Sequence, residues 1–439
     1  MSNGWKGGSG LSFALDSSMK RPRWRRRWVW WTGAGLAVAA LLLLLAQDQE
    51  TLQVESPVAA SDPRVAEYIA SLVGAKVETG DEYQVLRNGD EVFPAMLDAV
   101  RRAERRISFE SFIYENGEVG DQFTAELVAA ARRGVTIRIV LDAFGAELTQ
   151  ESVDALTMAG VEVRWFNPIR PWSLEETNYR THRKVMVADG RVGFTGGIGL
   201  ADHWLGAAQD PEHWRDTQFK VTGPAVRALE ASFYENWLEA GGRSAPALDP
   251  ERPGQGSARS LVLWSNPTGG ASNVKLLYLL SIAAARERID IQSPYFILDE
   301  SSRWALSEAR KRGVTIRVVT DGEITDAKPV KYSSREGYQQ LLDWGVEIYE
   351  YQPTMMHVKA MVVDSVWSVI GSANFDNRSF ELNDELTVAV ADDQLARDLT
   401  RDFEDDIRKS TRLDRATWKD RSLLEKTREQ FWALFGELF

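Results

Sequence analysis

Residues 182–189 read H-R-K-V-M-V-A-D, and residues 357–364 read H-V-K-A-M-V-V-D. Both stretches have the form H-x-K-x-x-x-x-D, and in each copy six residues separate the final Asp from a pair of small residues. A single H-x-K match carries little weight, because most histidines are ordinary core or surface residues. Two copies in register, which use two of only four histidines in the chain, indicate a duplicated functional motif.

The spacing inside each copy predicts a strand that directs two polar side chains into one site. Residues 184–187 are apolar enough for a buried strand, and alternation along a strand places His182 and Lys184 on the same face. Asp189 lies at the strand end before a glycine, where it is better placed to brace a turn than to react. The small pair Gly196-Gly197 is predicted to let backbone N–H groups approach a phosphate oxygen. The second copy supplies the equivalent residues His357, Lys359, Asp364 and Gly371-Ser372.

The repeat extends well beyond the two motifs. Residues 133–140 (R-G-V-T-I-R-I-V) are nearly copied at 312–319 (R-G-V-T-I-R-V-V), and residues 160–163 (G-V-E-V) match 345–348 (G-V-E-I). The offset between copies stays between 175 and 185 residues, which indicates a duplicated domain and not a short-period solenoid. Helical and strand periodicities alternate within each copy, which predicts a sheet covered by helices on both faces.

These motifs resemble the signature of the phospholipase D superfamily, which is H-x-K-x4-D followed by G-[GS]-x-N. The flanking sequence is similar to the bacterial cardiolipin synthase branch at 193–197 (G-F-T-G-G), 214–217 (W-R-D-T), 223–226 (G-P-A-V) and 374–383 (N-F-D-N-R-S-F-E-L-N). The resemblance covers roughly residues 83 to 412. It implies an α/β fold in which two duplicated phospholipase D-like α-β-α sandwich halves pack as a pseudo-dimer around one active site.

Phosphodiester exchange with two histidines divides into two roles. One neutral imidazole attacks phosphorus and forms a covalent phosphohistidine, while the other, protonated, gives its proton to the leaving alkoxide. Lys184 and Lys359 would stabilise the charge on the non-bridging oxygens. The resemblance implies that His182 is the nucleophile and His357 the general acid, which sequence symmetry alone leaves open. Two independent domains with separate sites are the less attractive alternative, because the reaction needs both histidines.

Each imidazole also needs an acceptor for its second nitrogen. By resemblance these acceptors are Asp216 and Glu385, which would otherwise be ordinary surface carboxylates. The resemblance also includes Asp189 and Asp364, the last residues of the two motifs, in the catalytic set. The sequence contains no cysteine and no carboxylate or histidine set with metal-ligand spacing, so we expect chemistry without a metal or other cofactor.

Contacts with the substrate phosphate are predicted for Gly197, Ser372 and Asn374. The first copy departs from the family pattern, because residues 196–199 read G-G-I-G and lack the Asn. This departure puts the phosphate contact of the first copy in doubt but leaves the His-Lys pair intact. The two remaining histidines are interpreted as loop or surface residues: His203 and His213.

The N-terminal residues predict a membrane anchor. Residues 1–27 carry a charge of +6, against −12 for the whole chain, and Trp28 to Ala46 then contain no charged residue. Nineteen residues make roughly 28 Å of helix, enough for one bilayer crossing, and the preceding arginines predict that the rest of the chain crosses the membrane. A cleaved signal peptide is the alternative, although the apolar run is longer than usual and lacks a clean A-x-A site. A buried core helix is a further alternative.

The predicted boundaries are a basic cytoplasmic tail at 1–27, a transmembrane anchor at 28–46, a linker at 47–82, a first half at 83–247, an inter-half linker at 248–257, a second half at 258–412 and a C-terminal amphipathic helix at 413–439. The C-terminal helix could lie on a membrane surface or pack on the domain, and packing is the interpretation we prefer.

The resemblance and the anchor together predict a phosphatidyltransferase of the cardiolipin synthase type at the cell membrane, with its catalytic domain on the extracytoplasmic side. The expected partners are the membrane, phosphatidylglycerol and a second phosphatidyl donor or acceptor. The acidic body argues against a nucleic-acid ligand. Phospholipid hydrolysis is the closest alternative, followed by a nuclease and a catalytically inactive membrane scaffold.

Overall fold

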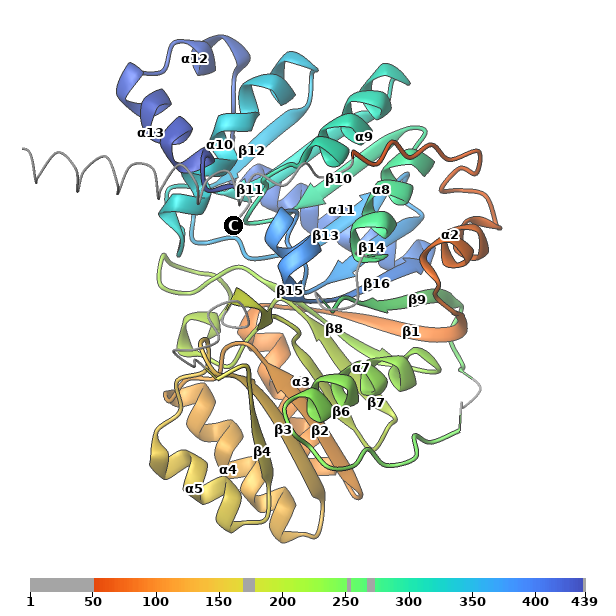
Figure 1. Ribbon diagram of the computed structural model, residues 1–439, viewed down its shortest axis with the longest axis vertical. Helices are drawn as coiled ribbons and strands as arrows, with labels where there is room; N and C mark the ends of the chain where they lie inside the picture. The colour runs from red at the N-terminus through yellow and green to blue at the C-terminus, as the bar shows by residue number, and fades with distance from the viewer. Residues whose placement is uncertain (1–50, 169–177, 251–253, 267–272, 437–439) are drawn as a thin grey trace, which may run out of the picture. The chain divides into compact units, whose positions relative to one another are not determined.

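A continuous sheet of fifteen strands runs through the protein, in the order β17-β12-β11-β10-β13-β14-β16-β9-β1-β8-β7-β6-β2-β3-β4. The computed structural model describes residues 51–168, 178–250, 254–266 and 273–436. The two halves of the chain meet at strands β1 (Val77–Arg87) and β9 (Ala258–Trp264), which pair antiparallel. Figure 1 shows the other strands of the first half on one side of this seam and those of the second half on the other.

The same sequence of strands leads outward from the seam on each side. In the first half it comprises β8 (Thr217–Thr222), β7 (Val192–Gly196), β6 (Val185–Ala188), β2 (Arg106–Ser111), β3 (Thr136–Asp142) and β4 (Glu162–Phe166). In the second half it comprises β16 (Leu386–Ala391), β14 (Trp367–Gly371), β13 (Ala360–Val363), β10 (Arg288–Gln292), β11 (Thr315–Asp321) and β12 (Glu347–Tyr351), with β17 (Ser410–Arg412) at the edge. In each half three neighbouring strands pair parallel: β2, β3 and β4 in the first half, and β10, β11 and β12 in the second. The other strands pair antiparallel, so the sheet is mixed. The prediction of two repeated α/β halves is confirmed.

Helices cover both faces of the sheet. Successive residues of a strand point to opposite faces, so neighbouring residues show which helices lie on each side. Leu86 of β1 packs in a core cluster with residues of α3 (Asn88–Arg102) and α4 (Glu118–Arg132). Its neighbour Val85 packs in a second cluster with residues of α7 (Ala225–Glu239) and α11 (Asp393–Arg408). Further helices are α5 (Gln150–Met158), α8 (Asn273–Ala284), α9 (Glu300–Lys311) and α10 (Lys328–Asp343).

The predicted boundary between the 47–82 linker and the first half is wrong. The part of the 47–82 linker from residue 65 onward contains α2 (Val65–Val73) and most of β1. Val65, Ile69 and Val73 are buried in the core cluster that includes α8, so this segment belongs to the folded unit. Burying such aliphatic side chains stabilises the fold by roughly 1.5–3 kcal/mol each.

From residue 413 to residue 436, the C-terminal segment forms two helices and not the single one that the sequence predicts. They are α12 (Arg415–Lys419) and α13 (Leu423–Ala433). The break occurs because Ser422 begins a new helix: its side chain accepts a hydrogen bond from the Glu425 N–H, and the Glu425 carboxylate accepts one from the Ser422 N–H.

The predicted anchor at 28–46 lies outside the described residues. From residue 51 to residue 436, none of the helices that the structure describes combines the length and apolarity needed to cross a bilayer.

Candidate active site

Two short backbone pairings join the halves at their H-x-K motifs. Strand β5 (Arg180–Thr181) pairs parallel with β15 (Asn383–Asp384), and the His182 N–H donates to the Asp384 carbonyl over 2.9 Å. On the other side, an isolated bridge joins Arg215 to Met356, and the His357 N–H donates to the Arg215 carbonyl over 2.7 Å. The backbone of each half therefore positions the histidine of the other.

The two histidines are paired with carboxylates across the halves. Nδ1 of His182 lies 3.0 and 3.1 Å from the two carboxylate oxygens of Glu385. Nδ1 of His357 lies 2.8 Å from Oδ2 of Asp216. These bonds fix each ring through Nδ1 and leave Nε2 as the nitrogen that can meet a substrate. The sequence predicted both carboxylates but not that each one serves the histidine of the opposite half.

The two lysines are buried beside the histidines. Nζ of Lys184 donates to the carbonyl of His182 over 2.9 Å, and Nζ of Lys359 donates to the carbonyl of His357 over 2.7 Å. Burial lowers the pKa of Lys184 to about 7 and that of Lys359 to about 8, although Glu385 and Asp216 oppose the decrease. Two buried ammonium groups make this region attractive to a phosphate.

Charges from both halves act on each other in this region. Burial lowers the pKa of His357 well below its ordinary value, and the charges of Lys359, Lys184 and His182 add to the decrease. Burial lowers the pKa of His182 to about 4, with Glu385 opposing the decrease. Because first-half charges perturb a second-half imidazole, the two motifs form one electrostatic site.

The two carboxylates differ in their ionisation. Burial raises the pKa of Glu385, but His182 and Lys184 outweigh burial and bring that pKa down to about 2. At Asp216 burial prevails over Lys359 and raises the pKa to about 6. The Glu385 carboxylate therefore stays ionised beside a neutral His182, whereas the pair of Asp216 and His357 binds a proton close to neutral pH.

The small pairs after each motif support these carboxylates. The Ser372 hydroxyl donates to Oε2 of Glu385 over 2.5 Å, and its N–H donates to the Leu386 carbonyl. At the equivalent Gly197, an added Cβ would lie 2.4 Å from Oδ1 of Asp216, so no side chain fits there. The Gly197 N–H donates to the Thr217 carbonyl, so in neither half is this N–H directed at a phosphate as predicted.

The missing Asn of the first half has a steric explanation. A Cβ on Gly199 would lie 2.9 Å from Cβ of Ile113 and 3.0 Å from Cζ3 of Trp204. The Trp204 ring fills this space, and its Nε1–H donates to Oδ2 of Asp216 over 3.1 Å. In the second half Asn374 is buried, and its Oδ1 accepts no hydrogen bond from the described residues. Of the equivalent residues Gly199 and Asn374, Asn374 is therefore the one whose side chain can contact a ligand.

Aromatic rings surround the histidines, and the sequence motifs did not predict these rings. The Phe112 ring lies 5.4 Å from the His182 ring, and Trp204 and Trp214 lie 5.6 and 5.7 Å from the His357 ring. His203 packs against both tryptophans, with ring centroids at 4.2 and 3.9 Å. Trp214 belongs to the quoted stretch 214–217, whereas Phe112 belongs to none of the quoted motifs.

The final Asp of each motif lies away from the histidines. Asp189 and Asp364 follow β6 and β13, whose other ends lead to the histidines, so roughly 20 Å of extended chain separates each Asp from its His. The Asp189 carboxylate accepts hydrogen bonds from the N–H groups of residues 104–106, and Asp364 accepts from those of residues 286–288. Their place in the predicted catalytic set is therefore wrong. The bracing role suggested by the turn is the one that the geometry supports.

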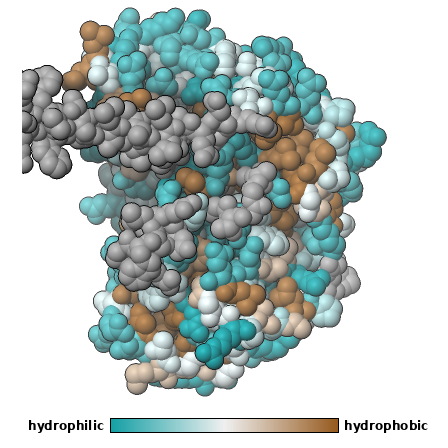
Figure 2. Space-filling model, viewed as in Figure 1, coloured by the Kyte–Doolittle hydropathy of each residue, from teal (hydrophilic) through white to brown (hydrophobic). Residues whose placement is uncertain are grey.

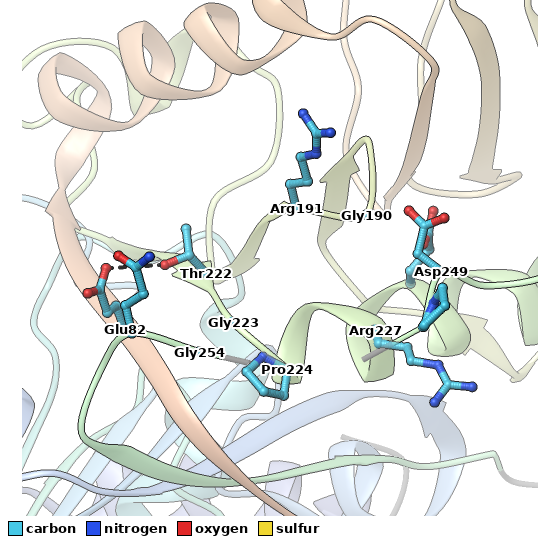
Figure 3. Close-up of a pocket in the computed structure, with 12 residues that line it drawn as sticks. Glu82, Gly190, Arg191, Thr222, Gly223, Pro224, Arg227, Asp249 and Gly254 are labelled. Carbon is cyan, nitrogen blue, oxygen red and sulfur yellow. Dashed lines mark hydrogen bonds between the residues drawn. The ribbon is translucent and has the colours of Figure 1, made fainter. Parts of the chain in front are cut away.

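A surface pocket also lies at this far end (Figure 3). It is lined by Gly190, Arg191, Pro224, Asp249 and neighbouring residues, none of which belongs to the histidine site. Gly190 directly follows Asp189, at the end of β6 opposite His182. The pocket is therefore separate from the chemistry described above.

Comparisons with known proteins agree with this architecture. A family model described as "Cardiolipin synthase, PLD-like domain" matches residues 96–213 and 278–407, one segment in each half. Cardiolipin synthase 2 of Bacillus anthracis is 35% identical over 380 residues, which cover 84% of this chain and 73% of that protein. Cardiolipin synthase of Geobacillus kaustophilus strain HTA426 is 33% identical over 406 residues, which cover 90% and 80%.

A solved structure shares the fold at low sequence identity. The phosphatidylserine synthase of Haemophilus influenzae Rd KW20 superimposes with a TM-score of 0.63 and 11% identity, over 84% of this chain and 97% of that one. The duplicated fold and the paired H-x-K motifs define a protein of the phospholipase D superfamily. Within that superfamily, the chain belongs to the cardiolipin synthase family.

Proposed function

We propose that this chain transfers a phosphatidyl group from one phosphatidylglycerol to a glycerol hydroxyl of another, which gives cardiolipin and free glycerol. The observation that carries the proposal is the crossed pairing of His182 with Glu385 and of His357 with Asp216. A family relationship to cardiolipin synthases supports the choice of lipid over other phosphodiesters.

In the first step, Nε2 of His182 attacks the phosphorus of the donor lipid. The bond between phosphorus and the glycerol headgroup oxygen breaks, and His357 gives that oxygen its proton. Glu385 prepares His182 for attack, because an ionised acceptor on Nδ1 keeps Nε2 unprotonated and stabilises the charge that develops on the ring.

In the second step, a hydroxyl of the acceptor phosphatidylglycerol loses its proton to His357 and attacks the same phosphorus. The bond between phosphorus and His182 breaks, and cardiolipin leaves. Asp216 suits this exchange, because its raised pKa lets the pair with His357 gain and lose a proton near neutral pH. Lys184, Lys359 and Asn374 are the residues proposed to contact the phosphate oxygens.

Transfer to an alcohol in preference to water requires a site that limits water access. Both motif lysines and His357 are at most 5% exposed, and the rings of Phe112, Trp204 and Trp214 lie against the imidazoles. An apolar, enclosed surround favours a lipid hydroxyl as the acceptor.

The test is product analysis with purified full-length chain and phosphatidylglycerol vesicles. The proposal predicts cardiolipin and glycerol in equal amounts. Phosphatidic acid as the sole lipid product would contradict it and indicate a hydrolase, and cleavage of DNA in place of lipid would indicate a nuclease.

We also propose that residues 28–46 anchor the chain in the cell membrane, with residues 51–439 on the extracytoplasmic side. The uncharged run and the arginines that precede it support this orientation. Protease added to intact spheroplasts should degrade the catalytic part. Protection until the membrane is lysed would contradict the orientation.

A further inference from the structure

Helix α13 has its amphipathic faces reversed relative to the usual arrangement. A surface helix normally packs its apolar face on the protein and exposes its polar face. In α13 the buried residue is Glu429, which is 2% exposed. Leu423, Leu424 and Phe431 are 82%, 80% and 52% exposed, and Leu434 at the C-cap is 67% exposed.

Charged contacts fix this orientation. Glu429 accepts a hydrogen bond from Nη2 of Arg421 over 2.7 Å and lies 3.4 Å from Nε of Arg335 on α10. The guanidinium of Arg428 lies 3.8 Å from the ring of Tyr332, also on α10. Rotating α13 to bury its leucines would leave a charge without its partners, which is costly in a buried position. These contacts therefore keep the apolar face of α13 directed outward.

The exposed apolar residues form one stripe. Positions 424 and 431 are seven residues apart and positions 431 and 434 are three apart, and both spacings place side chains on the same side of a helix. These residues are four of the nine large hydrophobic side chains exposed in the described part of the chain, and the other five all lie before residue 240. Figure 2 shows hydrophobic surface at the end of the molecule where Figure 1 places α13. A clustered patch of this kind marks an interaction surface.

Position favours a lipid bilayer as the partner. Residues 413–439 contain five Lys or Arg and five Asp or Glu, so this segment has no net charge on a chain of −12. A segment without the net negative charge of the rest of the chain can bring an apolar stripe to an anionic membrane surface. The supporting helix α10 follows Asp326, whose carboxylate accepts from the Tyr295 hydroxyl at 2.6 Å and has its raised pKa opposed by the charge of Lys359. The helix that supports α13 thus begins close to the active site.

We propose that α13 docks in the headgroup region of an anionic bilayer through Leu423, Leu424, Phe431 and Leu434, and thereby orients the active site toward its lipid substrates. The choice of lipid as partner rests on the proposed function. This contact is additional to the predicted N-terminal anchor and acts on a different part of the chain.

The absence of cysteine from the chain allows a direct test. Leu424→Cys and Leu434→Cys, each in the full-length protein, are labelled with an environment-sensitive fluorophore and reconstituted in phosphatidylglycerol vesicles. Met158→Cys is the matched control, because Met158 is an 88% exposed apolar residue at the end of α5. Lipids with a nitroxide on the acyl chain should quench the labels at 424 and 434 and shift their emission to the blue, and leave the label at 158 unchanged.

Two results would overturn the proposal. In the first, labels at 424 and 434 respond to lipid nitroxide no more than the label at 158. In the second, they are shielded from aqueous iodide yet remain unquenched by lipid nitroxide, which would assign the stripe to a second copy or to another segment of this chain. Neither readout depends on catalysis, so a failure here is distinct from a failure of the proposed function.

An activity comparison provides an independent check. The double substitution Leu423→Asp with Leu424→Asp should lower the rate on phosphatidylglycerol vesicles by about tenfold or more, because two apolar contacts with the bilayer are lost. The rate on a short-chain, water-soluble phosphatidylglycerol should stay within about twofold, since the active site is untouched. Equal loss on both substrates, or no loss on vesicles, would contradict the docking role.

Discussion

The two histidine-carboxylate pairs occupy equivalent places in the duplicated fold, yet they differ in chemistry. Glu385 receives a hydroxyl hydrogen bond from Ser372, and its pKa is lowered to about 2. Asp216 receives the indole N–H of Trp204, and its pKa is raised to about 6. One pair is thus set to present an unprotonated nitrogen and the other to exchange a proton. Duplication supplied two similar sites, and a few substitutions around them separated their roles.

The histidines themselves should give the largest effects. His182→Ala removes the nucleophile, and we expect a loss of roughly 10⁴-fold or more in kcat. His357→Ala removes the proton donor and should cost roughly 10² to 10⁴-fold. Rates of cardiolipin formation measure both losses, and His213→Ala is the control, because His213 pairs with Asp210 and belongs to neither motif. Substantial activity in either motif variant would refute a shared site.

Neutral isosteres of the carboxylates come next. Glu385→Gln removes a charge that is present throughout the accessible pH range, so we expect a loss of roughly 10³-fold in kcat. Asp216→Asn removes a carboxylate that is partly protonated near pH 6, and its effect should be smaller and should grow as pH rises. Steady-state kinetics between pH 5 and 8 distinguish the two. Losses of equal size and equal pH dependence would remove the distinction between the pairs.

Exchanging the small residues tests the same asymmetry sterically. Gly197→Ser places a side chain against the Asp216 carboxylate, where an added Cβ would lie 2.4 Å away, so we expect a loss of roughly 10²-fold. Ser372→Gly removes one hydrogen bond to Glu385 and should cost about tenfold. Thermal denaturation shows whether either variant is unfolded. If neither substitution lowered the rate, the two positions would be interchangeable and the steric asymmetry would be contradicted.

The pH profile should reflect the buried lysines. A lysine whose pKa is lowered loses its charge as pH rises, so kcat/KM should fall as pH passes through about 7 to 8, where Lys184 and Lys359 titrate. Below about pH 4 it should fall again as His182 gains a proton. Lys184→Arg retains its charge, so the alkaline limb should move upward from about 7 toward the pKa of Lys359, about 8. An alkaline limb that does not move in this variant would contradict the assignment.

The bracing aspartates should have the smallest effect on chemistry. Asp189→Ala removes a carboxylate that accepts three backbone hydrogen bonds, and we expect the free energy of unfolding to fall by about 2 to 4 kcal/mol. The kcat of the folded fraction should stay within about threefold. Because its backbone partners lower the pKa of Asp189, this stabilisation is present above its unfolded pKa and is lost as pH falls through the folded pKa. A large loss of kcat with unchanged stability would restore a catalytic role.

Much of the architecture could be predicted from the sequence. The duplicated motifs and the copied strand at 133–140 and 312–319 fixed the repeat and the α/β class, because strand periodicity and turn residues are local signals. The same local signals did not predict the elements that form through tertiary contacts. Residues 65–82 were predicted to belong to a linker, but α2 packs in the core cluster of the second half, and β1 pairs with β8 of the first half and β9 of the second.

The site was predicted in composition but not in arrangement. His182, Lys184, His357 and Lys359 follow from the motif, and Asp216 and Glu385 were implied by resemblance. The crossing of the carboxylates depends on pairings between residues about 140 to 200 positions apart, which no local pattern encodes. The substitution of Gly199 for Asn likewise makes sense only with the Trp204 ring in view.

The central claim is that one histidine per chain carries the phosphatidyl group while the other exchanges protons. The most direct measurement is mass spectrometry of peptides from the enzyme after rapid mixing with phosphatidylglycerol and denaturation under conditions that preserve phosphoramidates. The account predicts a phosphatidyl adduct on the peptide containing His182, at no more than one per chain. An adduct on His357 in place of His182, or on both histidines of one chain, would contradict the account.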